Sequence, residues 1–369
     1  MIVRLIVPYN ADTYTELCIF HRADMDGRGS GAMVNIANMI LERHVFFYGA
    51  NYEADFSIDK LLSSFPRLKN IFIVDYSISV EDTIKILSKN INVIWCDHHE
   101  TAKERYMSNS EFKLVSVDKN LEDTDIIQFG LSDKYKYPGK FYGYFSHQYS
   151  GAMITYKVLS SIFEKTDEYK KWYKNLGVIM DTISTYDTWN QTNKEKWNTA
   201  LTFNTVARDY DFSPYSLKWL EIANDTNVYY DILKEGYIIT RHDEISNKIN
   251  AGAYAGTLYW KDKCFCVIND MRNSLALNSV FDPNIHDACL FYKFNPKEKG
   301  FKDGKEIQGV WKITLFCSDL LPEEKKASMD LTTIVKEFGG GGHRCACGFG
   351  CVDLPFDIHD IKPIYKKTL

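Results

Sequence analysis

Acidic and imidazole side chains gather in three short stretches of the first hundred residues. In chain order these stretches contribute His21, Asp24 and Asp26, then Asp75, and then Asp97, His98 and His99. Carboxylate oxygens mixed with imidazole nitrogens suit Mn, Fe, Co or Zn better than Ca. Two such ions about 3.5–4 Å apart can activate a water and stabilise a leaving oxygen in phosphoryl hydrolysis. The pattern therefore predicts a two-metal hydrolytic site.

The spacing within the first stretch favours ligands for two different ions. Asp24 and Asp26 are separated by one residue on an expected turn, so their carboxylates can reach different ions. Gly27 would give that turn backbone freedom. Taken alone, Asp75 after a strand is more typical of a helix N-cap, and a lone histidine pair carries little information. The occurrence of all three stretches in this order favours the metal site.

Strands that alternate with short helices must position these groups. The expected strands cover 17–20, 44–48, 71–75 and 92–96, and the expected helices cover 30–41, 58–65 and 80–88. This alternation is typical of an α/β fold in which helices cover both faces of a parallel sheet. Ligands of such sheets lie beyond the carboxyl ends of the strands. Because each polar stretch follows a strand, we expect the side chains to converge on one edge of the sheet.

The rest of the chain predicts a helical region and then a second domain. Residues 150–190 have a helical pattern, and a charged helical region over 217–249 connects them to the second domain. Beyond Ala251 strand-like segments predominate, with an exposed hairpin loop at 297–308 and one helix at 329–338. The expected organisation is an α/β catalytic domain over 1–215, a helical linker over 216–251 and a smaller α+β domain over 252–369.

Bulk composition limits the class of protein. The chain has 369 residues, of which 45% are hydrophobic and 25% charged, and its formal net charge is -5. This charge argues against a protein that coats long nucleic acid through a basic surface, so we expect no long duplex partner. No apolar run approaches the ~18 residues of a membrane helix, and the first residues lack a signal-peptide pattern. A cytoplasmic protein without a membrane partner is expected.

The cysteines fit the same expectation. There are nine, scattered along the chain and odd in number, as expected for reduced thiols. Cys264 and Cys266 are separated by one residue, as are Cys345 and Cys347. Structural zinc sites typically have at least two intervening residues and a matching set of Cys or His, which the sequence does not offer. No zinc site is predicted.

Four motifs resemble those of a known family. They are His21-Arg22-Ala23-Asp24-Met25-Asp26-Gly27, Val74-Asp75, Asp97-His98-His99 and Gly339-Gly340-Gly341-Gly342-His343. In type and order they resemble the DHH/DHHA1 phosphoesterases, which include nano-RNases, RecJ-type exonucleases and cyclic-dinucleotide phosphodiesterases. The resemblance covers residues 16–352. It implies a parallel-sheet DHH domain, a smaller DHHA1 domain and an active site in the cleft between them.

The resemblance also implies ligands for two divalent ions, expected to be Mn²⁺. One ion would be held by His21, Asp24 and Asp75, and the other by Asp26, Asp75, His98 and an aspartate of a fourth motif. Asp187, in Tyr186-Asp187-Thr188-Trp189, is favoured for that motif over Asp181.

The same resemblance assigns roles in catalysis. A water between the ions would be the nucleophile, and its pKa would be lowered by the metals. Asp75 would bridge the ions, and the catalytic set would be Asp75, His98 and His99. His99 would lie beside the scissile phosphate, while Asp97 would orient a histidine.

In the second domain the resemblance points to the glycine-rich segment. Glycines alone are more typical of a flexible turn, but a histidine and an arginine come directly after them and favour an anion site. The implied substrate contacts are Gly340, Gly341, Gly342, His343 and Arg344. Family members commonly carry an arginine where this chain reads Thr314-Leu315-Phe316-Cys317-Ser318. Arg272 and Arg344 are the candidates to replace it.

Two further features leave alternatives open. Ser150 is expected to be the N-cap of a helix, although serines near this point of the family contact phosphate. Tyr76, Tyr186 and Trp189 flank the metal motifs and would either stack on a base or belong to the core.

Together these features favour a hydrolase that degrades short RNA or linear dinucleotides to nucleoside 5'-monophosphates. The alternatives are a cyclic-dinucleotide phosphodiesterase, a RecJ-like single-strand exonuclease and a non-catalytic nucleotide-binding protein. The intact metal motifs disfavour the non-catalytic alternative. A homodimer is compatible with the sequence.

Overall fold

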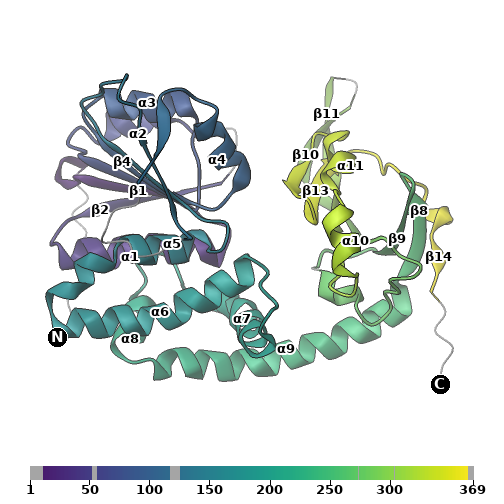
Figure 1. The fold of residues 1–369 in the computed structure, drawn as a ribbon. Helices are drawn as coiled ribbons and strands as arrows, with labels where there is room; N and C mark the ends of the chain where they lie inside the picture. The colour runs from purple at the N-terminus through teal and green to yellow at the C-terminus, as the bar shows by residue number, and fades with distance from the viewer. Residues whose placement is uncertain (1–10, 52–55, 117–124, 273, 303, 365–369) are drawn as a thin grey trace. The chain divides into compact units, whose positions relative to one another are not determined.

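The computed structural model describes residues 11–51, 56–116, 125–272, 274–302 and 304–364. The chain divides into two compact units between Thr240 and Arg241. In Figure 1 the first unit runs from purple to teal and the second from green to yellow. Helix α9 (Asn227–Tyr254) runs through this boundary, so much of the predicted linker is one long helix. The domain limits expected from the sequence remain predictions.

A seven-stranded sheet forms the centre of the first unit. In spatial order its strands are β2 (Val45–Ala50), β1 (Glu16–His21), β3 (Asn70–Val74), β4 (Asn92–Asp97), β7 (Phe141–Phe145), β6 (Ile127–Leu131) and β5 (Phe112–Val115). Neighbours from β2 to β7 are parallel, whereas β6 and β5 extend the sheet in antiparallel pairing. The α/β prediction is confirmed, and the antiparallel edge is an addition to it.

Helices cover both faces of this sheet, as the strand pattern predicted. Alternate residues of a strand point to opposite faces. In β3, Ile71 and Ile73 join one core cluster, while Phe72 and Val74 join another. The first cluster contains side chains of α2, α3 and α4, and the second contains side chains of α1, α5 and α6. These two groups of helices lie on opposite sides of the strands in Figure 1.

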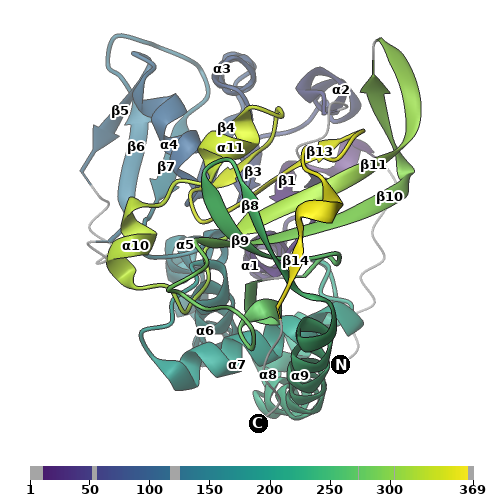
Figure 2. The same ribbon diagram turned by 90° about the vertical axis from the view of Figure 1, so that its right-hand side faces the viewer.

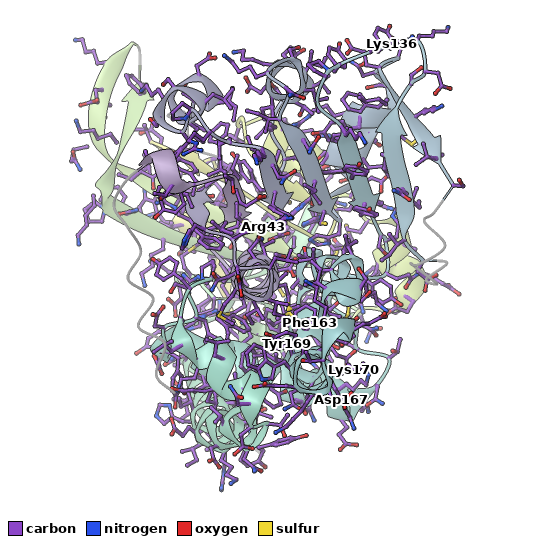
Figure 3. The ribbon with its side chains drawn as sticks, turned by 90° about the vertical axis from the view of Figure 1, so that its left-hand side faces the viewer. Arg43, Lys136, Phe163, Asp167, Tyr169 and Lys170 are labelled. Atoms are coloured by element: carbon purple, nitrogen blue, oxygen red, sulfur yellow. The ribbon has the colours of Figure 1, made fainter. Side chains whose placement is uncertain are left out.

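The helices of the first unit are more numerous than the alternating pattern required. They are α1 (Met25–Ile40), α2 (Ile58–Ser64), α3 (Val80–Ser88), α4 (Glu100–Met107), α5 (Gly151–Val158), α6 (Asp167–Asp187), α7 (Lys194–Val206) and α8 (Leu217–Asn224), before α9. Phe163 lies in the short 3-10 helix Ser160–Lys165 and is almost fully buried, with Tyr169 packed against the same core cluster. Both side chains are labelled in Figure 3, within the helical part of the unit. This part supplies α6, whose last residue is Asp187.

The beginning of α1 differs from the sequence prediction, which placed a turn there and started the helix at residue 30. The helix begins at Met25, with Asp24 as its N-cap, and the Asp24 carboxylate accepts a hydrogen bond of 3.0 Å from the Gly27 amide. Gly27 therefore lies within a helix and needs no unusual backbone angle. A Cβ at this position would lie 1.9 Å from the His21 carbonyl oxygen, so glycine is required by close approach.

A second seven-stranded sheet forms the other unit. Its strands, in spatial order, are β12 (Gly341–His343), β13 (Ala346–Cys351), β11 (Lys305–Phe316), β10 (Ala288–Lys302), β9 (Lys263–Ile268), β8 (Gly256–Trp260) and β14 (Lys362–Pro363). Its short helices are α10 (Glu323–Ser328) and α11 (Thr332–Lys336). All strand pairs are antiparallel except β9 with β10. Figure 2 shows these strands from a second side.

Two details of this unit correct the sequence predictions. Most of the segment predicted as an exposed loop at 297–308 is strand, because β10 and β11 extend as a long hairpin with a register shift between Asn295 and Lys299. The helix predicted over 329–338 is only the short α11. Charged residues along both long strands gave them the composition of a loop, which is why the pattern was misread.

Candidate metal centre

Three neighbouring strands of the first sheet deliver the polar stretches to one edge. β1 ends at His21, β3 ends directly before Asp75, and β4 ends at Asp97. Phe20 pairs with Val74, and Val74 pairs with Cys96, so the three ends lie side by side. This arrangement is the convergence that the sequence predicted for a parallel sheet.

The first group of ligand atoms gathers around His21. Its Nδ1 lies 2.8 Å from Asp24 Oδ2 and 3.7 Å from Asp75 Oδ2. Ligand atoms of these three residues all lie within 4.8 Å of one another. They offer one nitrogen and two carboxylates, which is a donor set suited to a divalent transition metal.

The second group gathers around His98. Its Nε2 lies 3.2 Å from Asp187 Oδ2, 3.4 Å from Asp75 Oδ1 and 3.7 Å from Asp26 Oδ2. Asp26, His98 and Asp187 offer ligand atoms within 4.8 Å of one another, as do Asp75, His98 and His99. We call His21, Asp24, Asp26, Asp75, His98 and Asp187 together the acidic-histidine cluster.

Asp75 is common to both groups. Its Oδ2 faces His21 and its Oδ1 faces His98, so its two oxygens point to different halves of the cluster. The residue is 2% exposed, and its Oδ1 accepts no hydrogen bond from any residue that the structure describes. Its backbone has φ 49°, a left-handed conformation that aspartate adopts more readily than most residues. A buried carboxylate oxygen without a hydrogen-bond partner in the described part of the chain, on a strained backbone, points to a ligand-binding role.

Asp26 is held by the beginning of α5. Its Oδ1 accepts hydrogen bonds from Ser150 Oγ at 2.5 Å and Ala152 N at 2.8 Å, and its Oδ2 accepts one from Gly151 N at 2.7 Å. Ser150 is thus the N-cap of α5 by position, but its hydroxyl binds Asp26 and makes no capping bond. Helix N-termini favour anions, so these donors offset part of the cost of burying a carboxylate that is 2% exposed, although burial and the charges of Asp75 and Asp187 still raise the pKa of Asp26. The sequence did not reveal this contact, because it joins residues 124 positions apart.

His99 is oriented by a buried chain of hydrogen bonds. Its Nδ1 lies 2.7 Å from Asp97 Oδ1, and Asp97 Oδ2 accepts a bond of 2.6 Å from Ser77 Oγ. Ser77 Oγ accepts in turn from Trp95 Nε1 at 2.9 Å. Trp95 and Asp97 are both 0% exposed. Asp97 lies beside the cluster without joining either ligand group, and Ser77 and Trp95 are supporting residues that sequence reasoning missed.

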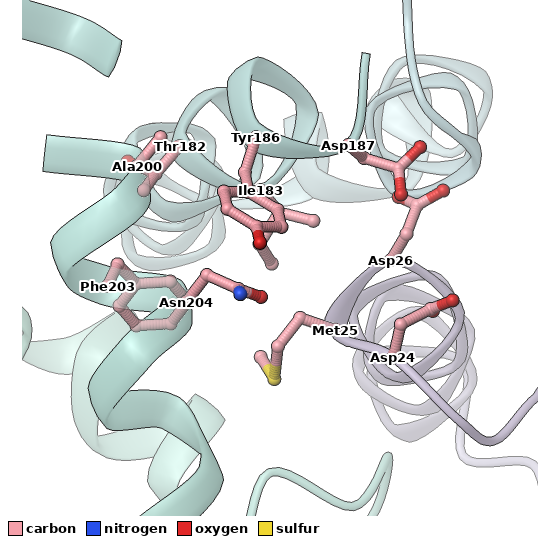
Figure 4. A pocket seen from close by; sticks show the side chains of 10 residues that line it. All are labelled: Asp24, Met25, Asp26, Thr182, Ile183, Tyr186, Asp187, Ala200, Phe203 and Asn204. Carbon is pink, nitrogen blue, oxygen red and sulfur yellow. The ribbon is translucent and has the colours of Figure 1, made fainter. Parts of the chain in front are cut away.

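The structure also separates the two aspartates considered for the fourth motif. Asp187 ends α6 within the cluster, and Figure 4 shows its carboxylate beside that of Asp26. Asp181 lies nearly two turns earlier on the same helix, where it forms a surface ion pair of 2.8 Å with Lys196. A small cavity of about 40 Å³ adjoins the cluster and is lined partly by Tyr186 and Asn204.

The pKa shifts of His21 and Asp187 show that positive charge stabilises the cluster. Burial opposes the charge of His21, but its close contact with Asp24 and the negative charges of Asp24 and Asp75 outweigh burial and raise the pKa of His21 to about 10. Burial, with repulsion from Asp75, raises the pKa of Asp187 to about 6 even though His98 lowers it. Asp187 therefore favours a bound proton, whereas at Asp75 the effect of burial is outweighed by His21 and His98, which lower the pKa of that carboxyl. Metal ions can replace such protons, since ligands must be deprotonated to bind them.

The glycine-rich segment of the second unit is mostly accounted for by packing. Gly341, Gly342 and His343 form β12, which pairs with β13. A Cβ on Gly340 would lie 2.4 Å from the Gly348 carbonyl oxygen, whereas a Cβ on Gly341 would meet nothing within 4 Å. Gly339 and Gly342 have φ of 71° and 132°.

Arg344, predicted to contact substrate, is engaged within its own unit. One guanidinium nitrogen donates to the carbonyl oxygens of Ala327 at 2.7 Å and Met329 at 3.1 Å. These carbonyls lie at the end of α10, where backbone acceptors lack helical partners. The other arginine considered, Arg272, is held by Asp270 and Asn247.

Of the aromatic residues near the metal motifs, some belong to the core and others are exposed enough to stack on a base. Tyr76 is 4% exposed and belongs to a core cluster. Trp189 is 37% exposed and contacts the rings of Tyr186 and Trp197. Trp189 and the rings beside it therefore offer surface for stacking on a base, whereas Tyr76 does not.

The cysteines and the hydrophobicity of the helices bear on zinc binding and on membrane insertion. All nine cysteines are free thiols, and none belongs to a potential metal site among the described residues. No helix in the described part of the chain combines the length and apolarity needed to cross a membrane.

Neither a protein-family model nor a curated protein matches the chain. Among solved structures, an exonuclease RecJ bound to manganese is similar, with 12% identity over 92% of this chain and 86% of that chain and a TM-score of 0.44. The pGpG-specific phosphodiesterase PggH of Vibrio cholerae has 12% identity over 92% of this chain and 94% of that chain, with a TM-score of 0.39. An exopolyphosphatase-related protein of Bacteroides fragilis has 11% identity over 94% and 89%, with a TM-score of 0.43. Each TM-score is below 0.5, so what the site does must be inferred from this chain's own residues.

Proposed function

We propose that the protein is a two-metal phosphodiesterase that hydrolyses short oligoribonucleotides or linear dinucleotides to nucleoside 5'-monophosphates. The observation that carries this proposal is the position of Asp75. Its two carboxylate oxygens face two different groups of ligands, with His21 on one side and His98 on the other. A buried carboxylate shared in this way is the arrangement that a pair of neighbouring cations requires.

The donor set fits two divalent ions. One would be held by His21, Asp24 and Asp75, and the other by Asp26, Asp75, His98 and Asp187. Nitrogen and carboxylate donors without cysteine suit Mn, Fe, Co or Zn, and Mn²⁺ is the ion proposed here. When bound, such ions supply an activated water and neutralise charge that develops on the phosphate.

The chain's own residues would orient the substrate. Asp97 engages Nδ1 of His99 and thereby fixes the imidazole, with its Nε2 edge directed away from Asp97. His99 is partly exposed, so this edge can donate a proton or a hydrogen bond to a phosphate oxygen. The α5 N-terminus and Ser150 hold the Asp26 carboxylate in place through three hydrogen bonds.

The charge of the chain favours a short substrate. The net charge of -5 argues against a protein that coats a long strand through a basic surface. The proposed contacts for the remainder of the substrate are Gly340, Gly341, Gly342, His343 and Arg344; of the three glycines, Gly341 has the most open surroundings.

Product analysis tests the proposal. Purified protein with Mn²⁺ would be given a 5'-phosphorylated diribonucleotide, a cyclic dinucleotide and a long single-stranded DNA in parallel. The proposal predicts rapid conversion of the linear dinucleotide to monophosphates and much slower turnover of the other two. Asp75→Asn should abolish the activity, while Asp181→Asn, on an aspartate outside the cluster, should retain it.

The other outcomes identify different functions. Preference for the cyclic compound would assign the same site to cyclic-dinucleotide signalling, and preference for DNA would assign it to a RecJ-like exonuclease. Binding without turnover of any substrate would contradict a catalytic role and favour a nucleotide-binding protein.

A further inference from the structure

Two thiols of the second unit face each other at the end of a strand pair. Cys317 comes directly after β11, and Cys345 directly precedes β13. Phe316 pairs with Ala346, and the Cys317 amide donates a hydrogen bond of 2.8 Å to the Cys345 carbonyl oxygen. The two cysteines are therefore the next opposing pair of the antiparallel ladder. Opposing residues of a hydrogen-bonded pair have Cα atoms about 5.5 Å apart, which lies within the range that a disulfide accepts.

The two cysteines differ in their surroundings. Cys317 is 8% exposed, whereas Cys345 is partly exposed in the two-residue turn that joins β12 to β13. A hydrogen bond with Cys317 lowers the pKa of Cys345 to about 7, assisted by the charges of Arg344 and Lys326 and opposed by burial. The same hydrogen bond and burial raise the pKa of Cys317. Cys345 is thus the thiol that is accessible and ionised near neutral pH.

We propose that Cys317 and Cys345 form an oxidant-sensitive dithiol whose co-reactant is a peroxide. The Cys345 thiolate attacks the peroxide, the O–O bond breaks, and Cys345 becomes a sulfenic acid while an alcohol or water leaves. The Cys317 sulfur then attacks the Cys345 sulfur, the S–O bond breaks and water departs with the Cys317 proton. The two thiols lose two electrons in total, which the peroxide gains.

The disulfide would tie the β12–β13 turn to the end of β11. This turn contains Arg344 and comes directly after His343, both of which are proposed substrate contacts. The dithiol itself does not depend on the proposed function, since its chemistry requires only the two sulfur atoms and an oxidant.

Cys351 provides a matched internal control. It lies on the same strand, β13, and is also partly exposed. It pairs with Trp311 across the ladder, so no thiol opposes it there. Burial raises the pKa of Cys351 to about 11.

Peroxide titration of the reduced full-length protein, with mass spectrometry of the products, tests the proposal. We expect the mass to fall by two hydrogens and a peptide linked through Cys317 and Cys345 to appear. Cys345→Ser should abolish the linkage, Cys351→Ser should leave it unchanged, and Cys317→Ser should leave a sulfenic acid at Cys345 that dimedone traps. At pH 7, iodoacetamide should alkylate Cys345 about tenfold faster than Cys351, or more.

Absence of the Cys317–Cys345 peptide, together with equal alkylation of Cys345 and Cys351, would overturn the proposal. A disulfide that joined a different pair of cysteines would also overturn it. Because neither readout uses enzymatic activity, failure here would leave the proposed function untouched.

Discussion

The acidic-histidine cluster of the first unit and the glycine-rich hairpin of the second, residues 339–348, were both predicted to be functional from sequence motifs. In the cluster, folding alone does not explain the arrangement, because a buried aspartate at φ 49° lies among other carboxylates. Such a conformation and such repulsion each oppose folding. In the hairpin, most features serve the fold, since Gly340 and Gly342 allow close packing and Arg344 binds carbonyl groups at the end of α10.

This difference indicates which motif residues have a role beyond stabilising the fold. A group whose position stabilises the unit would be retained for the fold even without a ligand. A group whose position opposes folding requires a compensating partner, and in the cluster we propose that this partner is a cation. Gly341 differs from its neighbours Gly340 and Gly342, because a Cβ at this residue would meet nothing within 4 Å and packing does not require a glycine there.

The largest expected effect is at Asp75. Asparagine tolerates the left-handed backbone but removes the bridging charge, so Asp75→Asn should reduce kcat by about a thousandfold or more, equivalent to roughly 4 kcal/mol. Steady-state kinetics on the linear dinucleotide with Mn²⁺ would measure it, and circular dichroism would verify the fold. A kcat within tenfold of the wild-type value would contradict the functional role assigned to the cluster and thus its distinction from the hairpin.

The next effect concerns the support of His99. Ser77→Ala removes the donor to Asp97 and should lower kcat by roughly tenfold to a hundredfold with little change in KM. Ser79→Ala is the matched control, because Ser79 caps α3 and should reduce stability by about 1 kcal/mol without a specific effect on kcat. Equal kcat values for the two variants would show that Ser77 is only structural.

The hairpin offers a comparison between neighbouring glycines. Gly340→Ala should destabilise the second unit by about 1–3 kcal/mol, because its Cβ would collide with the Gly348 carbonyl oxygen. Gly341→Ala should leave stability within about 0.5 kcal/mol of the wild type but raise KM, since Gly341 is open to a ligand. Thermal denaturation and kinetics together distinguish these effects. If Gly341→Ala leaves KM unchanged, the hairpin has no role in substrate contact at that residue.

The smallest effect is expected at Asp181. Its ion pair with Lys196 is half-exposed, so Asp181→Ala should change stability by less than about 1 kcal/mol and leave kcat unchanged. Denaturant unfolding and kinetics would test both expectations. A large loss of kcat would place Asp181 in the catalytic machinery and contradict the distinction drawn between it and Asp187.

The sequence allowed the convergence of the strand ends to be predicted, because carboxylates and histidines directly after hydrophobic runs are local signals. It did not reveal the hydrogen bonds of Ser150 to Asp26 or of Trp95 to Ser77. These contacts join segments that are distant in the sequence, and no periodic pattern of residues marks them. The role of Gly27 was also misread, because the carbonyl oxygen that excludes a Cβ belongs to His21 on the preceding strand.

The antiparallel edge of the first sheet and the length of the β10–β11 hairpin were missed for a related reason. Strands β5 and β6 are short, and charged residues interrupt the apolar pattern of β10 and β11. Their pairing is stabilised by backbone hydrogen bonds between partners, which composition does not report.

The central claim is that Asp75 bridges two metal ions, and titration calorimetry with Mn²⁺ tests it most directly. The account predicts two ions per chain for the wild type, with both sites weakened or one lost in Asp75→Asn and both retained in Asp181→Asn. A single ion in the wild type, or unchanged binding in Asp75→Asn, would contradict it.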